Sequence, residues 1–256
     1  MYLGTFIASL IGYLIGSFTF SIIVVKIKTS KDIREIGSNN AGATNTSRVL
    51  GLKWGIIVLI LDSLKVLLTA IIAMLINMIN NDLFNKTSFY IPMFFTLIGH
   101  CWPIYYKFKG GKAVSCFMGL LLVTNYILFI LFLTFSLTIF FIFKKVSLAS
   151  IIGSLIICIL TWIPYISGHY TFDINGWLFF TNAYNNNLYF VWFNKFHDLN
   201  KKSSFYDSFL TINIVLTLST VFLIVRHRKN IVRLFKGKEP NFGKKVVIDE
   251  KKHQNN

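Results

Sequence analysis

Three polar segments of this 256-residue chain hold the residue types and spacings that could do chemistry. They read KDIREIGSNNAGATNTSR over residues 31–48, GHCWPIYYKFKGGKAV over 99–114, and RHRKNIVRLFKGKEP over 226–240. Each combines glycines or small hydrogen-bonding residues with lysine or arginine. A flexible backbone, neutral donors and positive charge together suit the binding of a phosphate group.

The first segment places glycines and neutral donors just before an arginine. Gly37 and Gly42 allow positive φ angles, so successive backbone N–H groups can converge on one anion. Arg48 adds a planar guanidinium that matches phosphate oxygens. Further neutral donors are Ser38, Asn39, Asn45 and Thr46. This segment therefore predicts a loop that holds an anion.

The second segment repeats the same logic in the sequence GGK. Gly110 and Gly111 let a backbone approach a ligand closely, and Lys112 supplies a positive charge. A predicted helix follows, and its N-terminus favours an anion. The pattern differs from the nucleotide-binding loop, which needs G-x-x-x-x-G-K-[ST] after a strand. The three segments together favour a phosphorylated ligand at the cytoplasmic face of a membrane.

Each of these signals has an ordinary structural explanation when it is taken alone. A glycine pair between helices is usually a turn, and lysines at a helix end often contact lipid head groups. His100 alone is more often a structural residue at the interface, and His227 beside arginines is more often a surface residue. The occurrence of three such segments on one predicted side of the membrane favours the ligand site.

Composition identifies the class of protein that must position these segments. Hydrophobic residues make up 54% of the chain and charged residues only 14%, against about 25% charged in soluble domains. The net charge of +16 is distributed in basic clusters that alternate with apolar runs. That alternation follows the positive-inside rule of membrane proteins and excludes a nucleic-acid partner. The chain is therefore predicted to be a polytopic helical membrane protein.

The apolar runs predict an all-α membrane fold. The run 113–143 has lysines next to both ends, so we expect a helical hairpin turning near Thr124 and Asn125, with one long tilted helix as the alternative. The hairpin gives seven transmembrane helices, with the N-terminus outside and the C-terminus in the cytoplasm. The first run is predicted to be a span, because a signal peptide would carry basic residues before it and a cleavage site after it. The runs are 2–25, 54–78, 89–106, 113–143, 146–166 and 206–225.

Two parts of the chain stand apart from this bundle. A single domain is expected over residues 1–240, and it includes one long extracytoplasmic connection over 167–205. Residues 241–256 form a polar tail that is predicted to be cytoplasmic.

The three segments resemble the motifs of the PlsY family, the bacterial acyl-phosphate:glycerol-3-phosphate acyltransferases. Residues 37–48 are similar to the family's first motif, GSGN-x-GATN-x-x-R. Residues 99–112 are similar to its second motif, GH-x-x-P followed by F-x-GGK. Residues 227–239 are similar to its third motif, HR-x-NI-x-RL-x-x-G-x-E. Asn39 and Ala113 stand where the family usually has glycine. The resemblance extends over nearly the whole bundle and implies its seven-helix fold.

The resemblance also implies an activity. The family transfers an acyl group from acyl phosphate to the 1-hydroxyl of glycerol 3-phosphate and forms lysophosphatidic acid and phosphate, without a metal or a cofactor. The implied setting is the cell membrane of a bacterium, with a monomeric, multi-pass enzyme whose active site faces the cytoplasm.

The resemblance assigns roles to particular residues. Glu239 has a structural role. The implied catalytic residues are Ser38, Arg48, Lys112, His227 and Asn230. The implied substrate or phosphate contacts are Gly37, Asn39, Gly42, Thr44, Asn45, His100, Gly110, Gly111, Ser147, Ser150 and Arg228.

Two other classes of function were weighed against this one. A transporter of a phosphorylated or anionic solute would explain Asp62 and Lys65 within an apolar run, because charges inside a membrane usually have a function. Inverted repeats, which are common in transporters, are not evident in the sequence. A lipid-binding protein without enzymatic activity would not need the ordered loop of residues 37–45. The H-x-x-x-x-D motif of another acyltransferase class does not occur in the chain.

Overall fold

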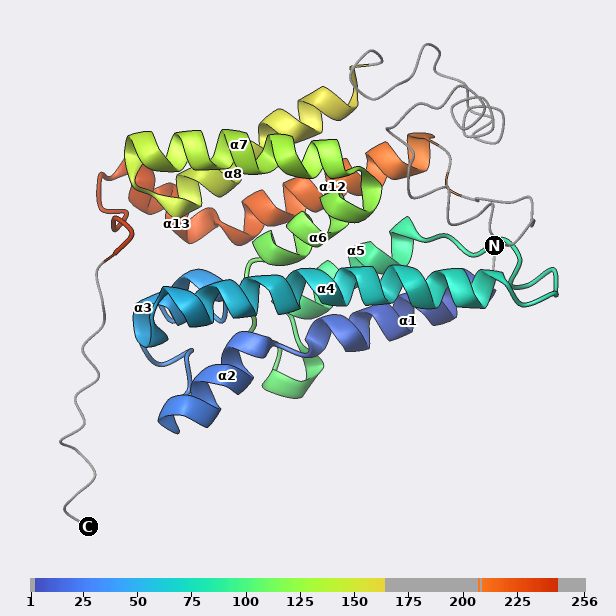
Figure 1. The fold of residues 1–256 in the computed structure, drawn as a ribbon, viewed down its shortest axis with the longest axis horizontal. Helices are drawn as coiled ribbons and strands as arrows, with labels where there is room; N and C mark the ends of the chain where they lie inside the picture. The colour runs from blue at the N-terminus through green and yellow to red at the C-terminus, as the bar shows by residue number, and fades with distance from the viewer. Residues whose placement is uncertain (1–2, 164–206, 208, 244–256) are drawn as a thin grey trace.

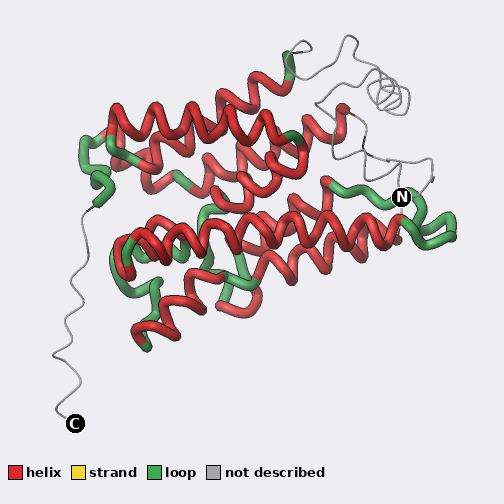
Figure 2. The backbone as a smooth tube through the Cα atoms, viewed as in Figure 1, coloured by secondary structure: helices red, strands yellow, loops and turns green. Residues whose placement is uncertain are grey.

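The computed structural model describes residues 3–163, 207 and 209–243, and the regular elements within these ranges are all helices (Figures 1 and 2). The predicted all-α fold is therefore confirmed. The predicted outer connection 167–205 and residues 244–256 of the predicted tail lie outside the described residues. The helices are α1 (Leu3–Ser17), α2 (Phe20–Thr29), α3 (Ala43–Leu50), α4 (Leu52–Asn77), α5 (Tyr90–Cys101), η1 (Ile104–Tyr106), α6 (Val114–Thr124), α7 (Tyr126–Phe143), α8 (Val146–Thr161), α12 (Phe209–Arg226) and α13 (Arg228–Phe235).

The long helices run along one common direction, and the short polar helices gather at one end (Figure 1). Among the described residues, three segments are long and apolar enough to cross a membrane: Leu3–Thr29, Leu52–Asn77 and Tyr126–Phe143. A fourth is added if α12 and α13, which are bent by 59° relative to each other, are counted as one span. At the left-hand end of the view in Figure 1, α3 lies beside the start of α4, and α13 lies beside α7 and α8.

The run 113–143 is two helices and not one. Asn125 separates α6 from α7 in an extended conformation, with φ −167° and ψ 122°. Its side-chain oxygen accepts a hydrogen bond of 2.8 Å from the N–H of Ile127 and so caps α7. The break falls at the predicted position near Thr124 and Asn125, and it excludes one continuous helix over this run.

Both ends of this run contact the same C-terminal segment. Lys112 Nζ, just before α6, donates to Asn230 Oδ1 at 2.6 Å. The carbonyl oxygen of Lys144, just after α7, accepts a hydrogen bond of 2.9 Å from the N–H of Phe242. The two lysine-bearing ends therefore lie on the same side of the bundle, which is the arrangement that a hairpin requires.

Two predicted spans are interrupted where the sequence suggested one helix. The run 89–106 is α5 followed by the short helix η1, because Pro103 lacks an N–H and restricts Trp102 before it. The run 2–25 is divided into α1 and α2 between Ser17 and Phe20. Both runs are therefore interrupted helices, and Leu3–Thr29 as a whole remains long and apolar enough to cross a membrane.

The break between α1 and α2 is stabilised by a buried charge cluster. Lys65 Nζ, on α4, donates to the carbonyl oxygens of Gly16 and Phe18 at 3.0 Å each. The same ammonium lies 2.9 Å from Asp62 Oδ1 and 3.0 Å from His100 Nδ1. Backbone groups inside a membrane need partners from the protein. Asp62 and Lys65 therefore stabilise an interrupted helix at the centre of the bundle.

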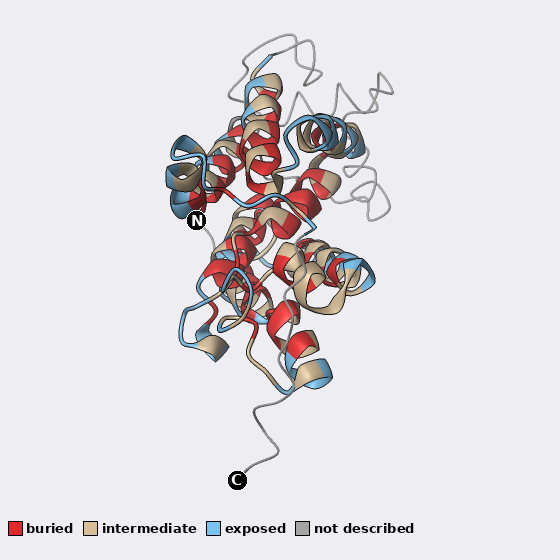
Figure 3. Ribbon diagram, turned by 90° about the vertical axis from the view of Figure 1, so that its left-hand side faces the viewer, coloured by how far each residue is buried: buried red, intermediate tan, exposed pale blue. Residues whose placement is uncertain are grey.

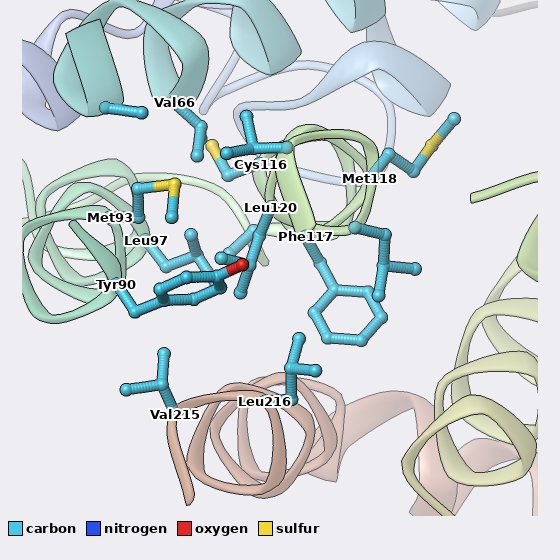
Figure 4. Packing of buried hydrophobic residues seen from close by; sticks show 14 of the residues in the cluster. Val66, Tyr90, Met93, Leu97, Cys116, Phe117, Met118, Leu120, Val215 and Leu216 are labelled. Carbon is cyan, nitrogen blue, oxygen red and sulfur yellow. The ribbon is translucent and has the colours of Figure 1, made fainter. Parts of the chain in front are cut away.

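The core is built around α6. Most residues of this helix are buried, whereas in α7 only Leu128 and Phe132 are buried. In Figure 4, Phe117 and Leu120 of α6 pack between side chains of α4, α5 and α12. Figure 3 shows the buried residues along the inner faces of the helices and the exposed ones on the outside. Because α6 is central, the loop that precedes it is held in place. Lys112 lies in this loop.

Candidate active site

Asn45 holds the first polar segment in shape. Its side chain is fully buried, and Nδ2 donates to the carbonyl oxygens of Ile33 at 3.1 Å and Ile36 at 2.9 Å. Its Oδ1 accepts from the backbone N–H of Ser38 at 2.9 Å. Both amide hydrogens and the oxygen are thus engaged within the loop. Contrary to the sequence-based expectation, Asn45 offers no free donor to a phosphate and instead positions Ser38.

The backbone of this segment uses positive φ angles at two residues. Gly37 has φ 64° and Asn39 has φ 57°. Asparagine tolerates this left-handed conformation better than most residues. Asn39 can therefore stand where the PlsY family usually has glycine. Gly42 was expected to share this property, but its φ of −166° is extended. Gly42 instead precedes α3, and its carbonyl oxygen accepts from the N–H groups of Asn45 and Thr46.

The helix α3 carries Arg48 to the cavity by packing closely on α4. Gly55 of α4 allows this approach, because a side chain there would collide with Ser47 and with the carbonyl oxygen of Ala43. Arg48 lies in the last turn of α3 and is partly buried. Among the described residues, no hydrogen bond to its guanidinium is found, so its donors are available to a ligand.

The two glycines of the second segment serve packing within the protein. The N–H of Gly110 donates to the carbonyl oxygen of Cys101 at 3.2 Å, and that of Gly111 to the carbonyl oxygen of His100 at 3.0 Å. A methyl group on Gly111 would collide with the ring of His100 and with the carbonyl oxygen of Ala41. Both N–H groups are therefore engaged within the protein. The missing side chain of Gly111 lets the backbone pack closely against His100 and Ala41, and not against a ligand as the sequence suggested.

A hydrogen-bonded chain of side chains joins Lys112 to the third segment. Lys112 Nζ donates to Asn230 Oδ1 at 2.6 Å, and Asn230 Nδ2 donates to Glu239 Oε1 at 2.7 Å. Glu239 also accepts from Ser147 Oγ at 2.7 Å and from Arg233 Nε at 2.7 Å. Glu239 thus makes the contacts of a structural residue, and Ser147 contacts it instead of lining the cavity.

The charges in this chain shift the pKa values of two groups. Burial, together with the positive charges of Arg233, Arg48 and Arg226, lowers the pKa of Lys112 to about 8, although the negative charge of Glu239 opposes this shift. Burial alone would raise the pKa of Glu239, but its hydrogen bonds from Ser147, Arg233 and Asn230 outweigh burial and hold that pKa below its ordinary value. Glu239 is therefore ionised at neutral pH. Lys112 begins to lose its proton just above neutral pH.

His227 is held in one tautomer. It is buried at the joint between α12 and α13, and its Nδ1 lies 2.8 Å from the carbonyl oxygen of Leu223. A carbonyl oxygen can only accept, so Nδ1 carries the hydrogen and Nε2 of the neutral ring is left as an acceptor. Because His227 lines the cavity, that acceptor is available to a proton-bearing ligand.

All three segments meet in one cavity of about 390 Å³. Its polar end includes Ser38, Arg48, Lys112, His227 and Asn230, together with Asn45, Thr44, Gly42 and His100. The rest of its wall is largely apolar and lies between α4 on one side and α6, α7 and α8 on the other. The apolar lining residues are Ala43, Leu52, Ile56, Leu59, Ala113, Val114, Met118, Phe132, Leu133, Leu137, Phe140, Val146, Ala149 and Phe242.

The cavity includes all five predicted catalytic residues but only some of the predicted binding residues. Ser150 lines the wall, and its hydroxyl donates to the carbonyl oxygen of Val146. His100 also reaches the wall, although its Nδ1 is held by the charge cluster of Asp62 and Lys65. The predicted contacts outside the lining are Gly37, Asn39, Gly110, Gly111, Ser147 and Arg228.

Two further contributors to the site, Arg226 and Arg233, have no specific signal in the sequence. Arg226 and Arg233 stand in a run of basic residues that would ordinarily lie at the membrane surface. In the structure, Arg233 binds Glu239, and Arg226 binds carbonyl oxygens of the second segment. The only signal available for them was their position within the third segment.

These observations define a helical membrane protein with a cavity that is cationic at one end and apolar along its length. The family model for glycerol-3-phosphate acyltransferase matches residues 6–237. The chain therefore belongs to the glycerol-3-phosphate acyltransferase family of integral membrane proteins. Curated relatives with that name are 47% identical over 249 residues in Mesoplasma florum and 49% identical over 248 residues in Mycoplasma mycoides subsp. mycoides. These alignments cover 95% and 96% of this chain and 97% and 96% of the relatives.

Two crystal structures of PlsY (YgiH), an integral membrane glycerol 3-phosphate acyltransferase, share the fold. The glycerol 3-phosphate form has a TM-score of 0.63 and 27% identity and covers 93% of this chain and 96% of its own. The lysophosphatidic acid form has a TM-score of 0.62 and 25% identity, with 94% and 96% covered. The resemblance stated from the sequence motifs is confirmed at the level of the family.

The lowered pKa of Lys112 predicts a pH dependence of anion binding. The ammonium is charged below about pH 8 and neutral above it, so sulfate affinity should fall as the pH rises through this value. Sulfate keeps its own charge over the neutral and alkaline range, so only the protein titrates. The fall should be on the order of tenfold or more, as for the loss of a charge-assisted hydrogen bond. Calorimetry on the protein in detergent micelles measures it.

Two variants test whether Lys112 is the titrating group. Lys112→Arg should move the fall well above pH 8, because arginine stays protonated. The exposed neighbour Lys109, changed to arginine, should leave the profile unchanged. An unchanged profile in Lys112→Arg would assign the titration to another group.

Proposed function

We propose that this protein transfers a fatty acyl group from acyl phosphate to the 1-hydroxyl of sn-glycerol 3-phosphate and releases lysophosphatidic acid and phosphate. The proposal rests on one observation above all: a cavity in which a cationic end built from three polar segments continues into an apolar wall. An acyl phosphate has the same division into an anionic head and an apolar tail. The names of the family and of the related crystal structures support the acceptor and the product.

In this proposal each part of the donor has a place in the cavity. The phosphate would lie by Arg48 and Lys112, whose charges can be satisfied by its oxygens. The Ser38 hydroxyl lies at the same end as a neutral donor. The acyl chain would lie along the apolar wall between α4 and α7, where Leu52, Ile56 and Leu137 are also open to the outside of the protein. This arrangement lets a lipid-soluble substrate enter from the bilayer.

Acyl transfer from acyl phosphate needs positioning more than strong acid catalysis. The hydroxyl oxygen of glycerol 3-phosphate attacks the acyl carbon, the bond from that carbon to the phosphate oxygen breaks, and phosphate leaves with the electron pair. The cations of Arg48 and Lys112 stabilise the charge that develops on phosphate. The hydroxyl proton passes to Nε2 of His227 or to a substrate phosphate. Asn230 holds the Lys112 ammonium in this scheme, because its Oδ1 accepts from Lys112 while one of its two amide hydrogens is donated to Glu239.

The transporter alternative loses its main support. It relied on Asp62 and Lys65 as groups on a substrate path. Both side chains are buried, neither lines the cavity, and Lys65 is engaged by carbonyl oxygens at the break between α1 and α2. Their position is explained by the stabilisation of a broken helix.

The same proposal includes the setting of the enzyme. Seven membrane crossings are counted if α1 with α2, α4, α5, α6, α7, α8 and α12 each cross once, with the N-terminus outside and the C-terminus in the cytoplasm. The active site then faces the cytoplasm of a bacterial cell membrane. Residues 1–240 form one domain, and 241–256 a cytoplasmic tail. The enzyme is proposed to act as a monomer, with Ser38, Arg48, Lys112, His227 and Asn230 of one chain at the polar end of the cavity.

The donor decides the reaction class. Purified protein in lipid bilayers should form lysophosphatidic acid from glycerol 3-phosphate and acyl phosphate, and little or none from acyl-CoA. The reason is that the polar end of the cavity clusters donors of the kind that bind phosphate, and the chain lacks the H-x-x-x-x-D motif of another acyltransferase class. Product formation is followed by mass spectrometry, with Lys112→Met as the inactive control. Equal turnover with acyl-CoA would contradict the assigned donor.

The hairpin of α6 and α7 predicts the accessibility of its two ends. Single cysteines at Lys109 and Lys144, in a chain without its native cysteines, should both resist an impermeant thiol reagent in intact cells. Asp82, in the exposed loop after α4, should be labelled when it is changed to cysteine. Labelling of either lysine position from outside would overturn the topology.

His227 provides a test of the proton path. If Nε2 takes the proton, His227→Gln should lower kcat on the order of 10²-fold or more, as the loss of a general base does. The exposed Lys229, changed to glutamine, is the matched control on the same helix turn. Substantial activity with an unchanged pH–rate profile in His227→Gln would assign the proton to the substrate phosphate and leave His227 an orienting role.

A further inference from the structure

Arg226, the last residue of α12, binds the backbone of the second polar segment. Its terminal guanidinium nitrogen donates to the carbonyl oxygen of Gly111 at 3.0 Å and to that of Cys101 at 3.4 Å. The guanidinium carbon also lies 5.2 Å from the centre of the Trp102 ring, within the range of a cation–π contact. None of these contacts involves the cavity itself, since Arg226 does not line it.

The bound carbonyl groups lie at the neck of a loop. Residues 102–109 leave the bundle after α5 and return before α6, and two backbone hydrogen bonds close the neck, from Gly110 to Cys101 and from Gly111 to His100. Arg226 adds a third connection across the same neck. The peptide groups of Gly111 are therefore held on both sides, by His100 at the N–H and by Arg226 at the carbonyl oxygen.

Lys112 follows this fixed point directly. Its side chain reaches Asn230, one helical turn beyond Arg226 and across the joint at His227. The second and third segments are thus joined twice, once through the backbone of Gly111 and once through the ammonium of Lys112. If the contact of Arg226 with the Gly111 carbonyl is lost, the backbone at Lys112 is no longer fixed. Only the hydrogen bond from the Lys112 ammonium to Asn230 then holds the side chain.

We propose that Arg226 is a positioning residue for the acyl transfer: by holding the carbonyl group of Gly111, it sets the direction in which Lys112 enters the cavity. The residue acts through Lys112 and has no contact of its own with the substrates. The proposal concerns the second and third segments only, so it stands or falls separately from the identity of the acyl donor.

The charge of Arg226 has a second effect that can be separated from its geometry. Lys112 is faced by Glu239, Arg233, Arg48, Arg226 and His227, and the cation at Arg226 is one of those that lower the pKa of Lys112, after burial. Removal of this cation should raise the pKa of Lys112. A neutral variant therefore weakens the placement of the lysine and at the same time makes it easier to protonate.

Two substitutions separate these effects. Arg226→Gln removes the charge and keeps an amide donor on a shorter side chain, whereas Arg226→Lys keeps the charge and loses the planar fork. In both variants kcat/KM should fall on the order of 10- to 100-fold, because a misplaced cation stabilises the leaving phosphate less. The alkaline fall in sulfate affinity should move above about pH 8 in Arg226→Gln and stay in place in Arg226→Lys. Lys229→Gln, exposed on α13, should change neither.

A double-mutant cycle decides whether Arg226 acts through Lys112. In the background Lys112→Met, the further change Arg226→Gln should cost little additional sulfate affinity, because the group that it positions is already absent. The readout is binding of sulfate to protein that is shown to be folded by circular dichroism and thermal unfolding. Equal and additive losses in both backgrounds would overturn the proposal, as would wild-type affinity and pH dependence in Arg226→Gln. A failed acyl-phosphate assay would leave these binding results intact.

Discussion

The hydrogen bond from Lys112 Nζ to Asn230 Oδ1, 2.6 Å long, is the contact on which the arrangement of the site depends. It joins polar segments that are 118 residues apart in the sequence. Asn230 is held in turn by Glu239, and Glu239 by Ser147 and Arg233, so the segment before α6, the start of α8, and α13 with the segment after it meet in one network. A lysine ammonium has three donors, and the network uses one of them. The cation is therefore fixed in place while two of its hydrogens can still serve a ligand.

The polar residues of the site fall into two groups according to whether their side chains already have partners. Asn45 is fully engaged, and Asn230 is held through its Oδ1 and one amide hydrogen, so both determine where their neighbours stand. The Arg48 guanidinium and Nε2 of His227 face the cavity, and within the described ranges no protein partner is found for them. This division explains why residues of similar type in one motif have different roles. An amide that holds a loop cannot at the same time bind a phosphate, because each of its donors satisfies one acceptor in the low-dielectric interior.

The sequence predicted the class of fold, the hairpin break and the meeting of three segments, because each depends on a strong local signal. Apolar length predicts α4 within about two residues at its start and one at its end, and an asparagine within an apolar run marks the break at Asn125. The sequence could not predict which partner each polar group binds in the folded chain. Gly110 and Gly111 gave the pattern of a ligand-binding turn, yet their N–H groups pair with carbonyl oxygens of α5 that are near only in the folded chain. Arg226 was hidden in a basic run for the same reason, since its partners Gly111 and Cys101 are more than a hundred residues away.

Broken helices connect these local arrangements with the membrane. The interruption between Ser17 and Phe20 leaves helix carbonyl groups that need partners from the protein, and the interruption at Trp102 and Pro103 ends α5. At the first interruption, Lys65 donates to the free carbonyl oxygens, and Asp62 balances its charge. The second interruption begins the loop whose neck is bound by Arg226. His100 belongs to both, because its ring contacts Lys65 and its carbonyl oxygen accepts from Gly111. The buried charges of Asp62 and Lys65 are therefore explained by the break between α1 and α2. A charged residue within an apolar run of such a chain indicates an interrupted helix as readily as a path for a solute.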